Sequence, residues 1–169
     1  MLRPPDPRRV ERLLGDDGDS VVALVPVTPQ DALPDTVGAV VARSVGLGRR
    51  TVAPDERWDD ASGAFVAPAS PVDLRARRQV LLALTAPSER LVVIGLDRLG
   101  RPAEVVWWTR VADLERVTVE PARLLGLATE ALVVAVPEGL FRFVLARPDR
   151  RSGHELAARL RSGVRYSDG

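Results

Sequence analysis

The sequence predicts a mainly β domain: a half-open antiparallel barrel of about seven strands, capped by a C-terminal helix and preceded by an N-terminal elaboration. Seven apolar runs of strand length follow one another between residues 79 and 146, and turn residues such as Pro121 and Pro137 separate them about every 8 to 12 residues. Connections this short cannot contain crossover helices, so neighbouring strands are expected to pair antiparallel. The runs are 80–85, 91–96, 103–109, 114–119, 123–128, 131–136 and 140–145.

The third run carries two consecutive tryptophans, Trp107 and Trp108, next to Val106. Consecutive strand residues point to opposite faces, so both tryptophans cannot enter one core. A strand that is apolar on both faces needs cover on both, and either the N-terminal half of the chain or a second subunit is expected to supply it. Val106, Trp107 and Trp108 are therefore the candidate interface for a protein partner or for self-association into a homo-oligomer.

The last predicted element is an amphipathic helix over residues 153–162. Ser152 and Glu155 have the spacing of a capping box, which predicts that Ser152 begins the helix. Leu156 and Leu160 follow one turn apart, and Gly163 is expected to end the helix in the left-handed conformation.

The N-terminal elaboration holds weaker signals. Asp6 and Pro7 predict the start of a short helix that ends at Gly15. The acidic segment 16–19 does not have calcium-loop spacing and is interpreted as a solvated turn, and 21–27 is expected to be a strand at an edge of the sheet. Residues 35–45 fit a helix or a strand. Residues 51–71 are expected to form a long surface connection anchored by Trp58, followed by a short helix after Ser70.

Composition limits the function classes. The chain has 169 residues, with 24 basic residues against 23 acidic ones, so no overall field attracts nucleic acid, and no nucleic-acid partner is expected. Every basic residue is arginine and there is no cysteine, a pattern typical of a GC-rich bacterial genome. No run is long enough for a transmembrane segment, and the first residues lack the apolar stretch of a signal peptide. A cytoplasmic protein is expected.

Two segments resemble a known family. The segment 82–85, Leu-Ala-Leu-Thr, followed by 90–93, Arg-Leu-Val-Val, resembles the strand, turn, strand opening of bacterial pleckstrin-homology-like (PH-like) and GRAM-like domains. The segment 108–117 resembles their polar turn leading into an apolar strand. The resemblance covers about the second half of the chain and implies a non-enzymatic protein-interaction or scaffolding module. The expected division is an elaboration at 1–78, a PH-like domain at 79–163 and a tail at 164–169.

The alternative function is binding of an anionic lipid headgroup or a small phospholigand at the open end of the barrel. Basic residues in the first strands do this in some relatives, and the candidates in this chain are Arg90, Arg98 and Arg101. The lysine-based motif of those lipid binders is absent.

No enzyme, cofactor or metal is expected. His154 is the chain's one histidine, and no Gly-x-Ser-x-Gly segment presents a nucleophile beside it. The glycines of 46–50 lack both the third glycine of a dinucleotide site and the lysine of a P-loop.

Overall fold

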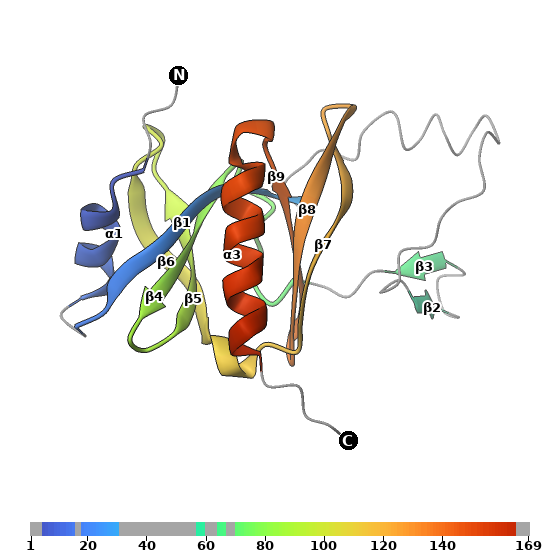
Figure 1. Cartoon of the computed structure of the whole chain (residues 1–169). Helices are drawn as coiled ribbons and strands as arrows, with labels where there is room; N and C mark the ends of the chain where they lie inside the picture. Colours follow the sequence, from blue (N-terminus) through green and yellow to red (C-terminus); the bar gives the residue numbers. More distant parts are fainter. Residues whose placement is uncertain (1–4, 16–17, 31–56, 60–63, 67–69, 165–169) are drawn as a thin grey trace.

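A computed structural model describes residues 5–15, 18–30, 57–59, 64–66 and 70–164. A seven-stranded antiparallel sheet curls around a C-terminal helix without closing, which confirms the predicted fold class (Figure 1). The strand order is β6-β5-β4-β1-β9-β8-β7. The elements are α1 (Pro7–Leu14), β1 (Ser20–Pro29), β2 (Arg57–Asp59), β3 (Ala64–Val66), β4 (Val80–Ala86), β5 (Arg90–Leu96), β6 (Pro102–Arg110), η2 (Val111–Asp113), β7 (Arg116–Leu124), β8 (Leu127–Val136), β9 (Gly139–Leu145), η3 (Arg147–Asp149) and α3 (Arg150–Gly163).

The centre of the sheet is β1, which pairs with β4 on one side and with β9 on the other. The prediction that this segment lies at an edge was wrong. Its near-continuous apolar sequence is that of a strand with both faces covered, and such a strand belongs in the middle of a sheet. The predicted strand 123–128 was also wrong, because Leu125 and Gly126 form the turn between β7 and β8. β1 supplies the seventh strand instead.

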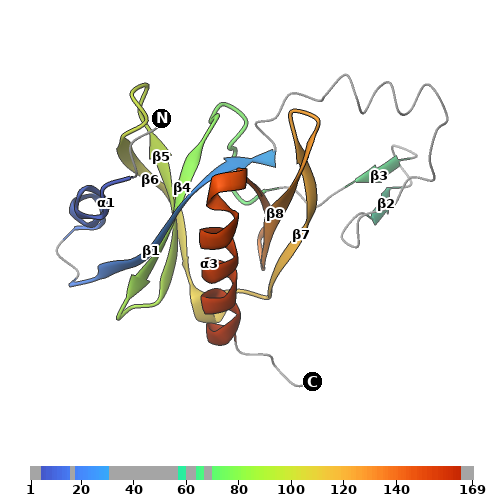
Figure 2. The same ribbon diagram turned by 45° about the horizontal axis from the view of Figure 1, so that its top comes forward.

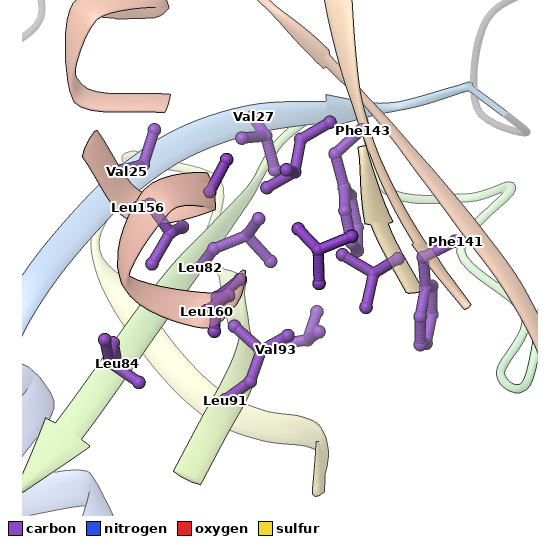
Figure 3. Packing of buried hydrophobic residues seen from close by; sticks show 14 of the residues in the cluster. Val25, Val27, Leu82, Leu84, Leu91, Val93, Phe141, Phe143, Leu156 and Leu160 are labelled. Atoms are coloured by element: carbon purple, nitrogen blue, oxygen red, sulfur yellow. The ribbon is translucent and has the colours of Figure 1, made fainter. Parts of the chain in front are cut away.

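The concave face of the sheet encloses the main core. Phe141 and Phe143 stack with ring centroids 5.2 Å apart, and Trp107 meets the Phe141 ring nearly edge-on at 4.7 Å. Trp107 lies on the edge strand β6, whereas Phe141 lies on β9, four strands away in the sheet order. A flat sheet could not bring these rings together, so their contact shows that the sheet is strongly curled. In Figure 3, Leu156 and Leu160 of α3 point into the same core.

α3 lies against this concave face and begins earlier than predicted. The helix starts at Arg150, directly after η3, with Asp149 as its N-cap residue, so Ser152 is inside the helix and the predicted capping box is not formed. Glu155 pairs with Arg151 instead. The predicted left-handed ending at Gly163 is also wrong, because the C-cap is Val164 in an extended conformation. Gly153 allows a close approach to β9: a Cβ there would lie 2.5 Å from a methyl group of Leu145.

α1 covers part of the convex face. Asp6 accepts a hydrogen bond from the Arg8 amide, Pro7 occupies the first turn and Gly15 follows the helix with φ of 82°, as predicted. Val10 is fully buried against β4 and β5. Figures 1 and 2 show α1 and α3 on opposite sides of β1 and β4. α1, in the N-terminal half of the chain, therefore covers part of the outer face of the sheet, as the sequence predicted.

The remaining predicted segments are partly described. Within 51–71, the backbone of Arg57–Asp59 pairs antiparallel with that of Ala64–Val66, so a small hairpin stands inside the predicted surface connection. The helix expected after Ser70 is a turn instead, in which the Arg75 amide donates to Asp73. Residues 35–45 and 46–50, and the side chain of Trp58, lie outside what the structure describes.

Candidate functional site

A β-bulge decides which residues of β6 face outward. Val93 of β5 pairs with Trp107, and the next residue, Ile94, pairs with Val105, which leaves Val106 as the extra residue. Val106 and Trp107 both pack against the main core on the concave side. Trp108 pairs with Val92, whose side chain belongs to the cluster under α1, so Trp108 lies on the convex side. The structure thus separates the three predicted interface residues, with Trp108 facing outward.

The outward residues of β6 form an apolar surface beside α1. Trp108 keeps 51% of its surface exposed, and Val105 keeps 36%. The guanidinium carbon of Arg90 lies 5.4 Å from the Trp108 ring centroid, a cation–π distance. Since β6 is an edge strand of the seven-stranded sheet, its outer backbone edge borders the same surface. We call Val105, Trp108 and Arg90 the Trp108 patch.

A buried carboxylate holds Arg90 in place. Asp19, with a side chain only 2% exposed, accepts hydrogen bonds from Arg90 Nη2 at 2.7 Å and Nε at 3.1 Å. Thr85 Oγ1 donates to it at 2.9 Å, and both the amide and the hydroxyl of Ser88 donate as well. We call Asp19, Thr85, Ser88 and Arg90 the Asp19 cluster. The interpretation of 16–19 as a solvated turn was wrong for Asp19.

The Asp19 cluster is a fixed ion pair. Burial by itself raises the pKa of Asp19, but the hydrogen bonds from Ser88, Arg90 and Thr85 outweigh it and hold the pKa far below its ordinary value. Asp19 therefore stays ionised at neutral pH. Because its oxygens already accept these hydrogen bonds, the carboxylate is poorly placed to act as a general acid or base.

The three arginines predicted to contact an anionic ligand do not form one site. Arg90 begins β5, whereas Arg98 and Arg101 lie in the turn after β5 ends, roughly 20 Å farther along the strand. In that turn Asp97 accepts hydrogen bonds from the amides of Leu99 and Arg101. The Arg101 amide is the main cause that lowers the pKa of Asp97. Arg98 and Arg101 are both exposed.

A second ion cluster ties α3 to β8. Glu130, with a side chain 25% exposed, accepts hydrogen bonds from Arg150 at 3.0 Å and from His154 at 2.8 Å. These two hydrogen bonds, that from Arg150 first, lower the pKa of Glu130 to about 2 against the opposing effect of burial. His154 therefore lies at an exposed ion pair, and the Glu130 cluster comprises Glu130, Arg150 and His154.

Sequence reasoning did not find the Asp19 cluster or the contribution of Arg90 to the tryptophan surface. Asp19 and Arg90 are 71 positions apart in the chain. Only the antiparallel pairing of β1 with β4 and of β4 with β5 brings them together. Alternation along β5 places Arg90 on the same face as Val92, and Val92 pairs with Trp108. This alternation is the one feature of the sequence that could have linked Arg90 to Trp108.

Within the described ranges, no three histidines, cysteines or acidic residues gather where they could hold a metal ion. Nor does any helix there have the length and apolar character needed to cross a bilayer.

Comparison with known proteins gave no match: no family model, no curated protein and no solved structure is significantly similar to this chain.

Proposed function

We propose that this chain is a non-enzymatic, PH-like protein-interaction or scaffolding module that binds a protein, a second copy of itself first among the candidates, through the Trp108 patch. The half-exposed Trp108 on an edge strand carries the proposal. Tryptophan and arginine are the residues most enriched at the energetic centres of protein interfaces. The curled antiparallel sheet with its C-terminal helix supports the family resemblance.

The Trp108 patch is organised before any partner binds. Arg90 is held by the buried carboxylate of Asp19, and its guanidinium in turn lies over the Trp108 ring. Association costs less free energy when side chains are already fixed, since fewer rotamers are lost on binding. Arg110, exposed and directly opposite Arg90 in the strand pairing, adds a positive charge at the border of the patch. A partner surface with a carboxylate facing Arg110 fits this arrangement.

The test is replacement of the exposed ring. We expect Trp108→Ala to raise the dissociation constant of self-association at least about tenfold, measured by sedimentation velocity over a range of concentrations. Leu125→Ala, which removes a still more exposed apolar side chain far from β6 in the sheet order, is the control and is expected to leave self-association unchanged. A wild-type chain that stays monomeric at every concentration would rule out self-association and leave a different protein as the partner. Equal association of wild type and Trp108→Ala would contradict the use of the patch.

A second candidate function is anionic-ligand binding at the turn between β5 and β6. Arg98 and Arg101 are both exposed there, and the backbone amides already occupy the one carboxylate of the turn, Asp97. We expect the double variant Arg98→Ala with Arg101→Ala to lose binding of inorganic phosphate in calorimetry if this function is correct. Arg90→Ala serves as the comparison, because Arg90 lies at the other end of β5. The cytoplasm remains the proposed compartment for either function, on the sequence alone.

A further inference from the structure

The turn between β7 and β8 carries two strongly exposed large apolar side chains close together, one of which, Leu125, is the most exposed among the described residues. Leu125 is 78% exposed and Leu127 is 60% exposed, and Leu124 before them is partly exposed. β7 is the edge strand opposite β6, and Figures 1 and 2 both show this hairpin projecting beyond the body of the sheet. We call Leu124, Leu125 and Leu127 the leucine tip. These side chains are presented to the surroundings and contribute little to the core.

The backbone of the leucine tip is unfavourable for the residue it holds. Leu125 has φ of 50° and Gly126 has φ of 80°, so both residues of this two-residue turn are in the left-handed region. Asn-Gly and Asp-Gly are the usual pairs in such turns, because a branched side chain is strained there. Leucine is therefore unfavourable at position 125 for two reasons: its backbone conformation is strained, and its apolar side chain is exposed to water. Neither feature helps the fold, so both point to a role outside it.

The surroundings of the leucine tip favour an anionic ligand. Arg123 directs its guanidinium back to the Gly126 carbonyl at 3.5 Å, so a positive charge lies at the turn itself. The nearest carboxylates on the two strands are already paired, Glu120 with Arg142 and Glu130 with Arg150 and His154. The start of α3 is brought to this end of β8 by the Glu130 cluster, about 10 Å from Leu127 by the rise of the strand.

The start of α3 carries charges of both signs, but they leave the surroundings of the leucine tip favourable for an anionic ligand. Arg147 and Arg151 are exposed, and Arg151 pairs with Glu155. Asp149 is partly buried, and burial raises its pKa. Leucines at the apex, with arginines beside and behind them, form the pattern of a surface that enters the boundary between lipid chains and headgroups.

A lipid surface fits the leucine tip better than a protein does. The apex is a small projecting turn with leucines and no aromatic residue, and leucine is under-represented at the energetic centres of protein interfaces. Acyl chains, in contrast, accept aliphatic side chains without a matching pocket. We propose that the leucine tip inserts into the outer part of an anionic phospholipid bilayer, with Arg123 at the level of the phosphates. This contact uses the edge of the sheet opposite the Trp108 patch, so it does not depend on the function proposed above.

The test uses the full chain and vesicles of phosphatidylcholine with and without phosphatidylserine. We expect the wild type to co-sediment with the phosphatidylserine vesicles, and the double variant Leu125→Asn with Leu127→Ser to lose at least about tenfold in partitioning. Arg123→Ala is expected to weaken binding to the anionic vesicles only. The double variant should keep its fold, because asparagine suits the turn and Leu127 is exposed, and circular dichroism checks this.

One control separates this contact from the Trp108 patch, since Trp108→Ala is expected to bind vesicles like the wild type. Loss of vesicle binding in the double variant of Arg98 and Arg101, with normal binding by the leucine variant, would place the lipid contact at the turn between β5 and β6 and overturn the proposal. Failure of the wild type to bind anionic vesicles overturns the proposal, as does equal binding by the leucine variant. If the wild type ignores vesicles and the leucine variant loses self-association, the leucine tip is a protein contact and the lipid proposal is wrong.

Discussion

The two edges of the sheet both expose apolar side chains, but they support them in opposite ways. On β6, Trp108 lies under a guanidinium that a buried carboxylate holds in place. On the β7–β8 hairpin, Leu125 occupies a strained turn without comparable packing. The first edge presents a rigid, flat aromatic surface, and the second presents a thin aliphatic apex. The difference shows that exposure alone does not identify a binding surface, because what lies behind a side chain decides which kind of partner it suits.

The largest expected effect is loss of the carboxylate behind the Trp108 patch. Asp19→Asn removes the charge that pairs with the largely buried Arg90, and we expect the free energy of unfolding to fall by about 3 kcal/mol. For a chain of this size that is a drop in melting temperature of roughly 6 to 12 °C. Thermal unfolding followed by circular dichroism measures it.

The matched variant near the other edge of the sheet, on β8, is Glu130→Gln. Its partners Arg150 and His154 are 43% and 53% exposed, so solvent weakens the pairing, and a loss below about 1 kcal/mol is expected. Equal losses in Asp19→Asn and Glu130→Gln would remove the contrast between a rigidly supported edge and a loosely supported one.

Acid unfolding distinguishes the same two carboxylates. The pKa of Asp19 is lowered in the folded protein, so its ionised form stabilises the fold above the ordinary carboxyl pKa of about 4 and this contribution is lost as pH falls below that value. The contribution of Glu130 is lost between about pH 4 and its folded pKa of about 2. We expect Asp19→Asn to flatten the pH dependence of urea unfolding between about pH 4 and pH 2 more than Glu130→Gln does. An unchanged slope in Asp19→Asn would show that folding does not lower the pKa of this carboxylate.

A further small effect, at the leucine tip, has the opposite sign. Leu125→Asn replaces a branched side chain in the left-handed region by the residue that tolerates it best, and we expect a gain of about 1 kcal/mol in unfolding free energy. Differential scanning calorimetry would show a melting temperature about 2 to 4 °C higher. Leu127→Asn, at a position that begins a strand, is the control and should bring no gain. A less stable Leu125→Asn would mean that the leucine packs usefully in the fold, against its role as an outward contact.

Local patterns predicted the elements well and the long-range arrangement less well. The alternation of Phe141, Arg142 and Phe143 and the Asp6-Pro7 start of α1 were correct because each depends on neighbouring residues. The exposure of one tryptophan of the pair was also predictable, since strand geometry forces it. The β-bulge at Val106 decides which tryptophan faces outward. The sequence of β6 contains no residue that would predict this bulge.

Other errors came from signals that competed with one another. The Leu125-Gly126 turn was concealed by leucines on both sides, which made 123–128 resemble a strand. The capping pattern at Ser152 and Glu155 was outweighed by η3, which starts the helix at Arg150. The position of β1 could have been inferred from its apolar run, by the same reasoning applied to β6. The partners of Asp19 could not, because they are separated along the chain and joined only by strand pairing.

The central position of β1 has a consequence for how the chain can be divided. β1 joins two sets of three strands that hardly share any other backbone pairing among the described residues: β4, β5 and β6 on one side, and β9, β8 and β7 on the other. A fragment limited to residues 79–169 would keep every strand of both sets yet leave a slot where β4 and β9 each lack a neighbour. A peptide of residues 18–30 is shaped to fill that slot, so this chain offers a natural place for splitting a protein into two pieces that reassemble on mixing.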